Sequence, residues 1–440
     1  MSSDFPFGFG AGGNDPERRE PGGGPEDMLG KMPLFAELQK LLSYSGGPVN
    51  WDLARQGAIG QVAGGHRPVS DGELKEVQAA LRLADLWLGE VTEFPTGITS
   101  TTAWSRVEWV EKTLPVWSTL CDPVAAQIAA TMTSVIPPEA AAAAGQMGGM
   151  LQALGGMMFG AQVGQAMASL SSEVLTSTDV GLPLAPAGTA VLLPQNILEF
   201  GNGLELPAEE IRLFLALREA AYQRLFGHVP WLRQRLFDTV ETYAHGITVD
   251  VEAMRSKMEE AMGSLDPTNP ESLQAAMQSG MFAPQESPDQ QRAMVRLETL
   301  LALTEGWVDA VVSQAAQGRL PGAEALTETI RRRRASGGPA EQIFATLVGL
   351  ELRPRRMRDA ATMWTALQAD QGVGPRDRLW SHPDLLPSAE DLDDPAGFVR
   401  AQTSEPTTAW SVEALDAAGP APVDPEQNRP GPREDEENHG

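Results

Sequence analysis

The chain has very few of the side chains on which metal sites and covalent catalysis usually depend. Its 440 residues include one cysteine, Cys121, and five histidines. A single cysteine excludes an intrachain disulfide and a thiolate zinc site, and we expect Cys121 to be a small buried apolar residue. Neither H-E-x-x-H nor H-x-H occurs, and G-x-S-x-G and G-x-x-x-x-G-K-[ST] are absent too, so the common hydrolase and nucleotidase motifs are missing. The histidines are His66, His228, His245, His382 and His439.

Positive charge is also scarce. The chain carries 33 lysines and arginines against 59 acidic residues, which gives a net charge of −26 and a pI near 4.6. Such a field repels nucleic acid and anionic membranes. The first residues show no basic segment followed by an apolar one, so the sequence predicts a cytoplasmic protein. The 42% hydrophobic content is enough for one large core or two smaller ones.

One long stretch, residues 140–172, has no charged residue at all and is rich in glycine, alanine and methionine. Its length would allow a membrane span. Gln146, Gln152, Gln162 and Gln165 interrupt it, however, and it has little leucine or isoleucine, which makes insertion into a bilayer unfavourable. We therefore favour a buried helix pair that packs closely through small residues over a membrane span.

The most informative segment is a patterned helix expected at about residues 207–226. Its apolar stripe contains Arg218 and Tyr222, and Glu219 lies at the edge, where it could face a cleft. A buried arginine needs a partner. The apolar members of the stripe are Ile211, Phe214, Leu215, Leu225 and Phe226.

The amino-acid sequence around this segment resembles that of a known family. The run L-R-E-A-A-Y-Q-R-L-F-x-x-V-P-W-L at residues 217–232 and the sequence L-T-E-G-W-V-D at residues 303–309 are similar to two helices of the bacterial zincin-like metallopeptidases, hydrolases of uncharacterised function. The opening F-P-F-G-F-G and the segment G-L-P-L at residues 181–184 also look like that family. The resemblance covers roughly residues 34–368. It implies a mainly α fold with a small β-sheet (α+β) and a helical N-terminal part.

The resemblance also assigns roles to particular positions. Members of the family carry H-E-x-x-H or R-E-x-x-H before V-P-W-L, so Arg218 and Tyr222 stand where zinc-binding histidines would stand, and Glu219 stands at the general-base position. Trp307 stands where E-G-H has its histidine, while Glu305 and Asp309 keep an E-x-x-x-D spacing. Guanidinium has no free lone pair for a metal. We therefore expect no metal or cofactor, and we expect Arg218 to replace the ion by pairing with Glu305 and Asp309.

Three functions remain open from the sequence. The favoured one is a zincin-like protein without its zinc ligands that acts as a binding or scaffold module for a protein or peptide partner. The alternative is an active metal-dependent peptidase, with Glu219 as general base and zinc held by Glu305, Asp309 and a further ligand such as His228 or His245. The third is an interaction protein whose resemblance to zincins is limited to the fold.

The sequence also predicts how the chain is organised. Residues 1–30 are expected to be disordered, residues 31–380 to form one mostly helical zincin-like domain, and residues 381–440 to form a disordered acidic tail. Short strands are expected at 189–194 and 196–200, the latter followed by a turn, and helices at 230–243, 251–262, 271–279 and 290–317. The arginines at 331–334 and 353–358 are expected to balance the acidic charge; alternatives are contact with an acidic partner, a phosphate or the chain's own tail.

Overall fold

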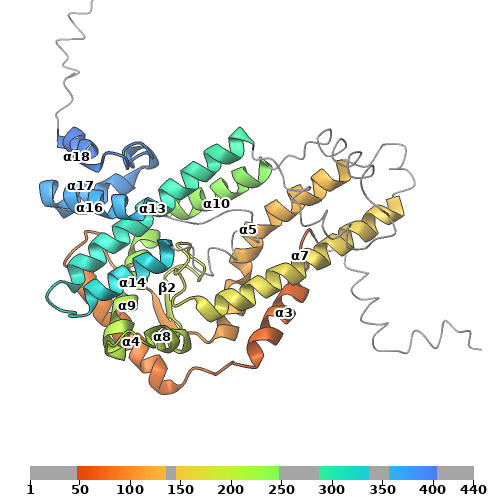
Figure 1. Ribbon diagram of the computed structural model, residues 1–440, viewed down its shortest axis with the longest axis horizontal. Helices are drawn as coiled ribbons and strands as arrows, with labels where there is room; N and C mark the ends of the chain where they lie inside the picture. Colours follow the sequence, from red (N-terminus) through yellow and green to blue (C-terminus); the bar gives the residue numbers. More distant parts are fainter. Residues whose placement is uncertain (1–46, 135–144, 247–286, 336–355, 404–440) are drawn as a thin grey trace, which may run out of the picture.

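The protein is a mainly helical molecule with one very small sheet (Figure 1). The structure, a computed structural model, describes residues 47–134, 145–246, 287–335 and 356–403. Its helices and strands, in chain order, are α3 (Trp51–Ala63), α4 (Asp71–Leu88), β1 (Ser100–Ala103), α5 (Arg106–Ser134), α7 (Gly145–Glu173), β2 (Thr189–Leu192), α8 (Pro194–Gly201), α9 (Ala208–His228), α10 (Pro230–His245), α13 (Pro288–Ala316), α14 (Ala323–Ala335), α16 (Met357–Gln371), α17 (Val373–Arg378), the 3-10 helices η1 (Leu379–Ser381) and η2 (Pro383–Leu385), and α18 (Pro395–Thr403).

The helix boundaries follow local chemistry that the sequence displays. Ser70 caps α4 through a capping box with Glu73, and Ser287 caps α13 in the same way with Gln290. Pro230 occupies the first turn of α10, where a missing backbone N–H costs nothing. The predicted helices at 207–226, 230–243 and 290–317 are therefore confirmed, with ends shifted by one or two residues. The expected fold class, helical with a small sheet, is confirmed as well.

The sheet has two parallel strands, with Ser100 opposite Thr189 and Ala103 opposite Leu192. The other side of β2 is also covered, because Leu192 forms an antiparallel bridge with Thr176. Both edges of β2 therefore bind the chain itself. The strand expected at 196–200 is wrong. Those residues belong to helix α8, which Pro194 starts and in which Ile197 is buried while Leu198 is exposed.

The uncharged stretch forms one continuous helix over its described part, α7, instead of the expected pair. Close packing through small residues is confirmed, because the backbone of α7 approaches the backbone at the start of α3 closely at two glycines. A Cβ on Gly160 would lie 2.5 Å from the Asn50 carbonyl oxygen, and one on Gly164 would lie 2.6 Å from that of Ala54. Among the described residues, no helix is long and apolar enough to cross a membrane.

A single set of buried side chains connects the helices. Cys121 lies within it, fully buried on α5, and burial raises the pKa of its thiol to about 12. The expectation that it is a buried apolar residue is confirmed. Trp109, Trp117, Trp307, Trp364 and Trp380 are among the largest fully buried side chains.

The folded part continues beyond the predicted domain end at residue 380. Residues 381–403, expected to begin a disordered tail, include η2 and α18, and α18 packs on α16 through the buried Val399. The apolar residues Leu392, Phe398 and Val399 lie within this acidic segment and pack on the core. Acidic composition alone therefore placed the start of the tail too early. Residues 1–30 and the helices predicted at 251–262 and 271–279 lie outside the described residues.

The contact between α3 and α7 leads to a first prediction. Gly164→Ala should lower the free energy of unfolding by about 1–3 kcal/mol, because the new methyl group overlaps the Ala54 backbone. Gly155→Ala is the matched control on the same helix, since a Cβ there meets nothing within 4 Å. It should be neutral or stabilising by up to ~1 kcal/mol. Urea unfolding of both variants measures the difference, and equal stability would contradict the close approach of the two helices.

Candidate functional site

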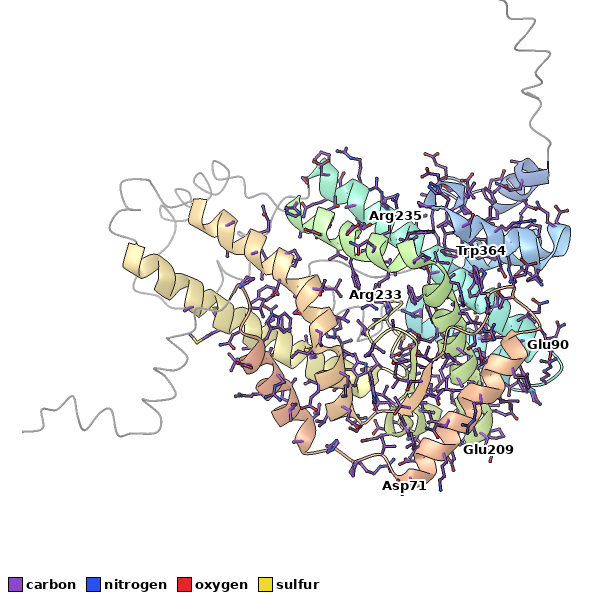
Figure 2. All side chains as sticks on the ribbon, turned by 180° about the vertical axis from the view of Figure 1, so that it is seen from behind. Asp71, Glu90, Glu209, Arg233, Arg235 and Trp364 are labelled. Atoms are coloured by element: carbon purple, nitrogen blue, oxygen red, sulfur yellow. The ribbon has the colours of Figure 1, made fainter. Side chains whose placement is uncertain are left out.

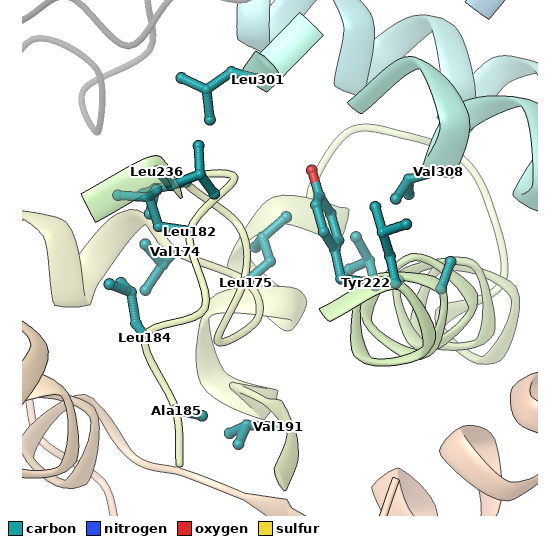
Figure 3. Close-up of a cluster of buried hydrophobic side chains, with 14 of the residues drawn as sticks. Val174, Leu175, Leu182, Leu184, Ala185, Val191, Tyr222, Leu236, Leu301 and Val308 are labelled. Atoms are coloured by element: carbon teal, nitrogen blue, oxygen red, sulfur yellow. The ribbon is translucent and has the colours of Figure 1, made fainter. Parts of the chain in front are cut away.

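The candidate site lies where α9, α13 and α14 meet. Arg218 and Tyr222 are one turn apart on α9, so their side chains leave the same face of the helix. Arg218 is 6% exposed and Tyr222 is 2% exposed. Figure 3 shows the Tyr222 ring among buried aliphatic side chains, with Leu175 on one side and Val308 on the other. The predicted burial of this arginine and tyrosine is confirmed.

Glu305 of α13 is the centre of the site. Its Oε1 accepts from the Arg218 guanidinium and its Oε2 accepts from the Tyr222 hydroxyl. Arg334 of α14 donates to the same Oε2 at 2.9 Å. The carboxylate is 2% exposed, so its charge depends on these donors rather than on water. The expected pairing of Arg218 with Glu305 is confirmed.

Arg334 is a member of this site that the sequence interpretation missed. It lies on α14 one turn beyond Ile330 and two beyond Leu326, and both of those side chains are buried. The positions 326, 330 and 334 thus form one buried stripe at helical spacing. That stripe was the available signal, and it was obscured by treating residues 331–334 as one basic cluster.

Two of its neighbours in the cluster also bind partners inside the molecule, whereas Arg332 is exposed and pairs with Glu328 on its own helix. Arg331 pairs with Asp309, and Arg333 pairs with Asp179 at 3.2 Å while lying over the Phe200 ring. The expectation that Asp309 pairs with Arg218 is therefore not met: its ion-pair partner is Arg331. The expected charge balance exists, but it consists of specific internal pairs.

Glu219 does not face a cleft. Its side chain is fully buried, and five donors from three parts of the chain surround its two oxygens. Ser177 Oγ and Thr178 Oγ1 each donate at 2.6 Å. The remaining donors are the backbone N–H of Thr178 at 3.3 Å, the backbone N–H of Val191 at 3.2 Å and the Gln223 amide at 3.0 Å. The carboxylate thereby fixes the 177–178 segment and β2 against α9.

Trp307 also belongs to a different cluster. Its indole N–H donates to Asp377 at 3.0 Å, and Asp377 additionally accepts from Thr92, from the Glu93 backbone N–H and from Arg376. Gly306, beside it, allows α16 to approach: a Cβ there would lie 2.6 Å from the Ala360 Cβ. The E-G-W sequence therefore connects α13 to α16 and to the 92–93 turn.

His228 and His245, the two histidines considered as further metal ligands, have other partners. His228 stacks on Phe94, and His245 contacts the Glu241 carbonyl oxygen. In the part of the chain that the structure describes, no three histidine, cysteine, aspartate or glutamate side chains are grouped so that they could hold a metal ion.

The residues around Glu305 do not fit a zinc ion. Zinc sites use imidazole, thiolate or carboxylate donors. The groups that face this carboxylate are two guanidinium groups and a phenol that donates its proton, and a cation would be repelled by the arginines. The geometry therefore holds a carboxylate with protein donors and gives no basis for a metal-bound step.

Comparison with known proteins identifies the family. The model of the zincin-like metallopeptidases matches residues 49–399, which is most of the chain. The chain belongs to the zincin-like metallopeptidase family. Its fold is also similar to the crystal structure of a "putative hydrolase with a novel fold" from Chloroflexus aurantiacus, with a TM-score of 0.57 and 19% identity over 81% of this chain and 99% of the other. The comparison with curated proteins gave no match.

The buried pair at the centre of this zincin-like protein leads to a second prediction. Arg218→Ala should lower the free energy of unfolding by about 3–5 kcal/mol, because it leaves the buried Glu305 with fewer compensating donors. Arg212→Ala on the same helix is the control. The Arg212–Glu76 pair is more exposed, at 21% and 55%, so its loss should cost about 0–1 kcal/mol. Urea unfolding distinguishes the two, and equal losses would contradict the central role of Arg218.

Glu219 gives a third prediction. Glu219→Gln keeps the size of the side chain but replaces an acceptor oxygen by an N–H₂ group that must face donors. We expect a loss of about 2–4 kcal/mol in the free energy of unfolding. Glu209→Gln, at an exposed position on the same helix (Figure 2), should change it by less than about 1 kcal/mol. A Glu219→Gln protein as stable as wild type would show that the carboxylate is not structural.

Proposed function

We propose that this zincin-like protein keeps the family's fold around an arginine in place of a metal ion, and that it works as a binding or scaffold module for a protein or peptide partner. The observation that carries the proposal is the Glu305 carboxylate bound by both Arg218 and Tyr222. These are the two α9 positions at which H-E-x-x-H members of the family have histidines.

The physical argument is charge substitution. A buried carboxylate without a cation costs several kcal/mol, and a divalent ion or a guanidinium can each compensate it. Arg218 supplies the charge and Tyr222 supplies a hydroxyl donor, so α9 and α13 stay together without a metal ion. Arg334 adds α14 to the same contact, which makes the centre a structural connection among three helices.

The alternative, an active metal-dependent peptidase, requires Glu219 to take a proton from water. A general base needs a lone pair within hydrogen-bond reach of that water. The oxygens of Glu219 instead accept from Ser177, Thr178, Val191 and Gln223 within the core. Because its oxygens already accept these hydrogen bonds, a structural role is favoured for Glu219. A module that functions through its surface is therefore favoured over an enzyme that uses this centre.

Restoring the histidines tests the proposal directly. Wild-type protein, purified without a histidine tag and dialysed against zinc, should hold far less than one zinc per chain by elemental analysis. Arg218→His/Tyr222→His recreates H-E-A-A-H beside Glu305 and should bind about one zinc per chain, because two imidazoles and a carboxylate form a standard ligand set. Adding Arg334→Met removes the remaining cation and should increase the zinc affinity further.

The control isolates the third ligand. Glu305→Gln in the two-histidine background should weaken zinc binding by roughly 10-fold or more, since only the two helical imidazoles remain. Circular dichroism checks that each variant stays helical. One zinc per wild-type chain, together with zinc-dependent cleavage of a peptide mixture, would overturn the proposal.

A further inference from the structure

A groove on the surface, away from the Glu305 centre, carries the inference. It has a volume of about 650 Å³ and lies between α10, the N-terminal half of α13 and the segment from Pro383 to Ala389. The residues of α13 that line it recur at helical spacing, so the groove follows one face of that helix. Figure 1 shows α10 and α13 side by side along this region.

The charge of the groove is opposite to that of the protein. Among the described residues that line it, the charged ones are Arg235, Arg292 and Arg296, although the chain as a whole carries −26. Arg235 and Arg296 are exposed and form no ion pair with any described residue. Arg292 pairs only with Asp289 on its own helix, where both side chains are about 70% exposed (70% and 71%), and such a pair contributes little.

The groove also has an apolar floor. Val295 lies between Arg292 and Arg296 and is 51% exposed, and Trp231, Leu300 and Leu386 line the walls. Trp231 is held in place, because its indole N–H donates to the Trp380 carbonyl at 3.0 Å and its ring stacks on that of Trp380. Arginines around an apolar floor are suited to an acidic peptide that has an apolar anchor.

The chain contains such a peptide directly after its last described helix. Residues 404–440 carry nine acidic residues against two arginines, and the apolar residues Trp410, Val412 and Leu415 lie close to their start. They follow Thr403 at the end of α18, which is 14 residues after Ala389 in the wall of the groove. Trp410 is the seventh residue after Thr403, a reach of up to about 25 Å when extended.

We propose that residues 404–440 occupy this groove, with the Trp410–Leu415 segment on the Val295 floor and its acidic residues against Arg235 and Arg296. The sequence suggested the arginines at 331–334 as one receiver for the tail. Arg331, Arg333 and Arg334 bind Asp309, Asp179 and Glu305 inside the molecule, and Arg332 pairs with Glu328 on its own helix. Arg235 and Arg296 have no ion-pair partner among the described residues. The tail then covers an apolar surface that an acidic partner peptide could otherwise bind. This inference does not depend on the state of the Glu305 centre.

Disulfide trapping in the full-length chain tests the inference. Val295→Cys/Ser411→Cys places one thiol on the groove floor and one in the tail, and the native Cys121 does not interfere because it is buried with a raised pKa. Under mild oxidation, peptide mass mapping should find the intramolecular 295–411 disulfide. It should form about tenfold faster than the disulfide of Leu385→Cys/Ser411→Cys, because docking raises the effective concentration at the floor.

Leu385 is a close control. It is 48% exposed, compared with 51% for Val295, and it lies in the wall segment without lining the groove. Adding Arg235→Glu/Arg296→Glu, or raising the salt concentration to 1 M, should slow 295–411 trapping by roughly tenfold, because both changes remove the attraction between charges. Equal rates at positions 295 and 385, no effect of charge reversal, or a disulfide formed only between two chains would each overturn the proposal.

Discussion

The structure depends on the compensation of one buried carboxylate. Glu305 is 2% exposed, so its charge must be balanced by groups that the protein brings to it. Arg218 and Tyr222 come from α9 and Arg334 from α14, and the three helices are thereby placed around α13. The helices supply this balance themselves, and the ends of the α9 and α14 side chains become part of the core.

The positions next to this centre on α9 and α13 make structural contacts of their own. Glu219, next to Arg218, connects the 177–178 segment and β2 to α9. Trp307, two residues after Glu305, connects α13 to Asp377, and Asp309 holds Arg331. Each of these residues is buried and satisfied by protein groups. A centre built in this way stabilises the fold.

The surface groove and the centre show two uses of arginine. At Glu305 the guanidinium groups are buried, and their partners are fixed by packing. In the groove, Arg235 and Arg296 are exposed around an apolar floor, where a charge is useful only when an oppositely charged chain approaches.

The sequence by itself determined the local features. The stripe on α9 predicted that Arg218 and Tyr222 are buried, and the single cysteine excluded a disulfide. Through the family resemblance, the sequence also predicted that Arg218 pairs with Glu305. Only the tertiary structure decided that Arg334 joins this pair, that Asp309 binds Arg331 and that Glu219 is enclosed by residues 177–191. These contacts join residues 22–42 positions apart. Helical periodicity identifies which face is buried without identifying the element that packs against it. The helix at 194–201 and the packing of α18 were missed as well. In both cases a few apolar residues become buried against other elements, which the local sequence pattern does not indicate.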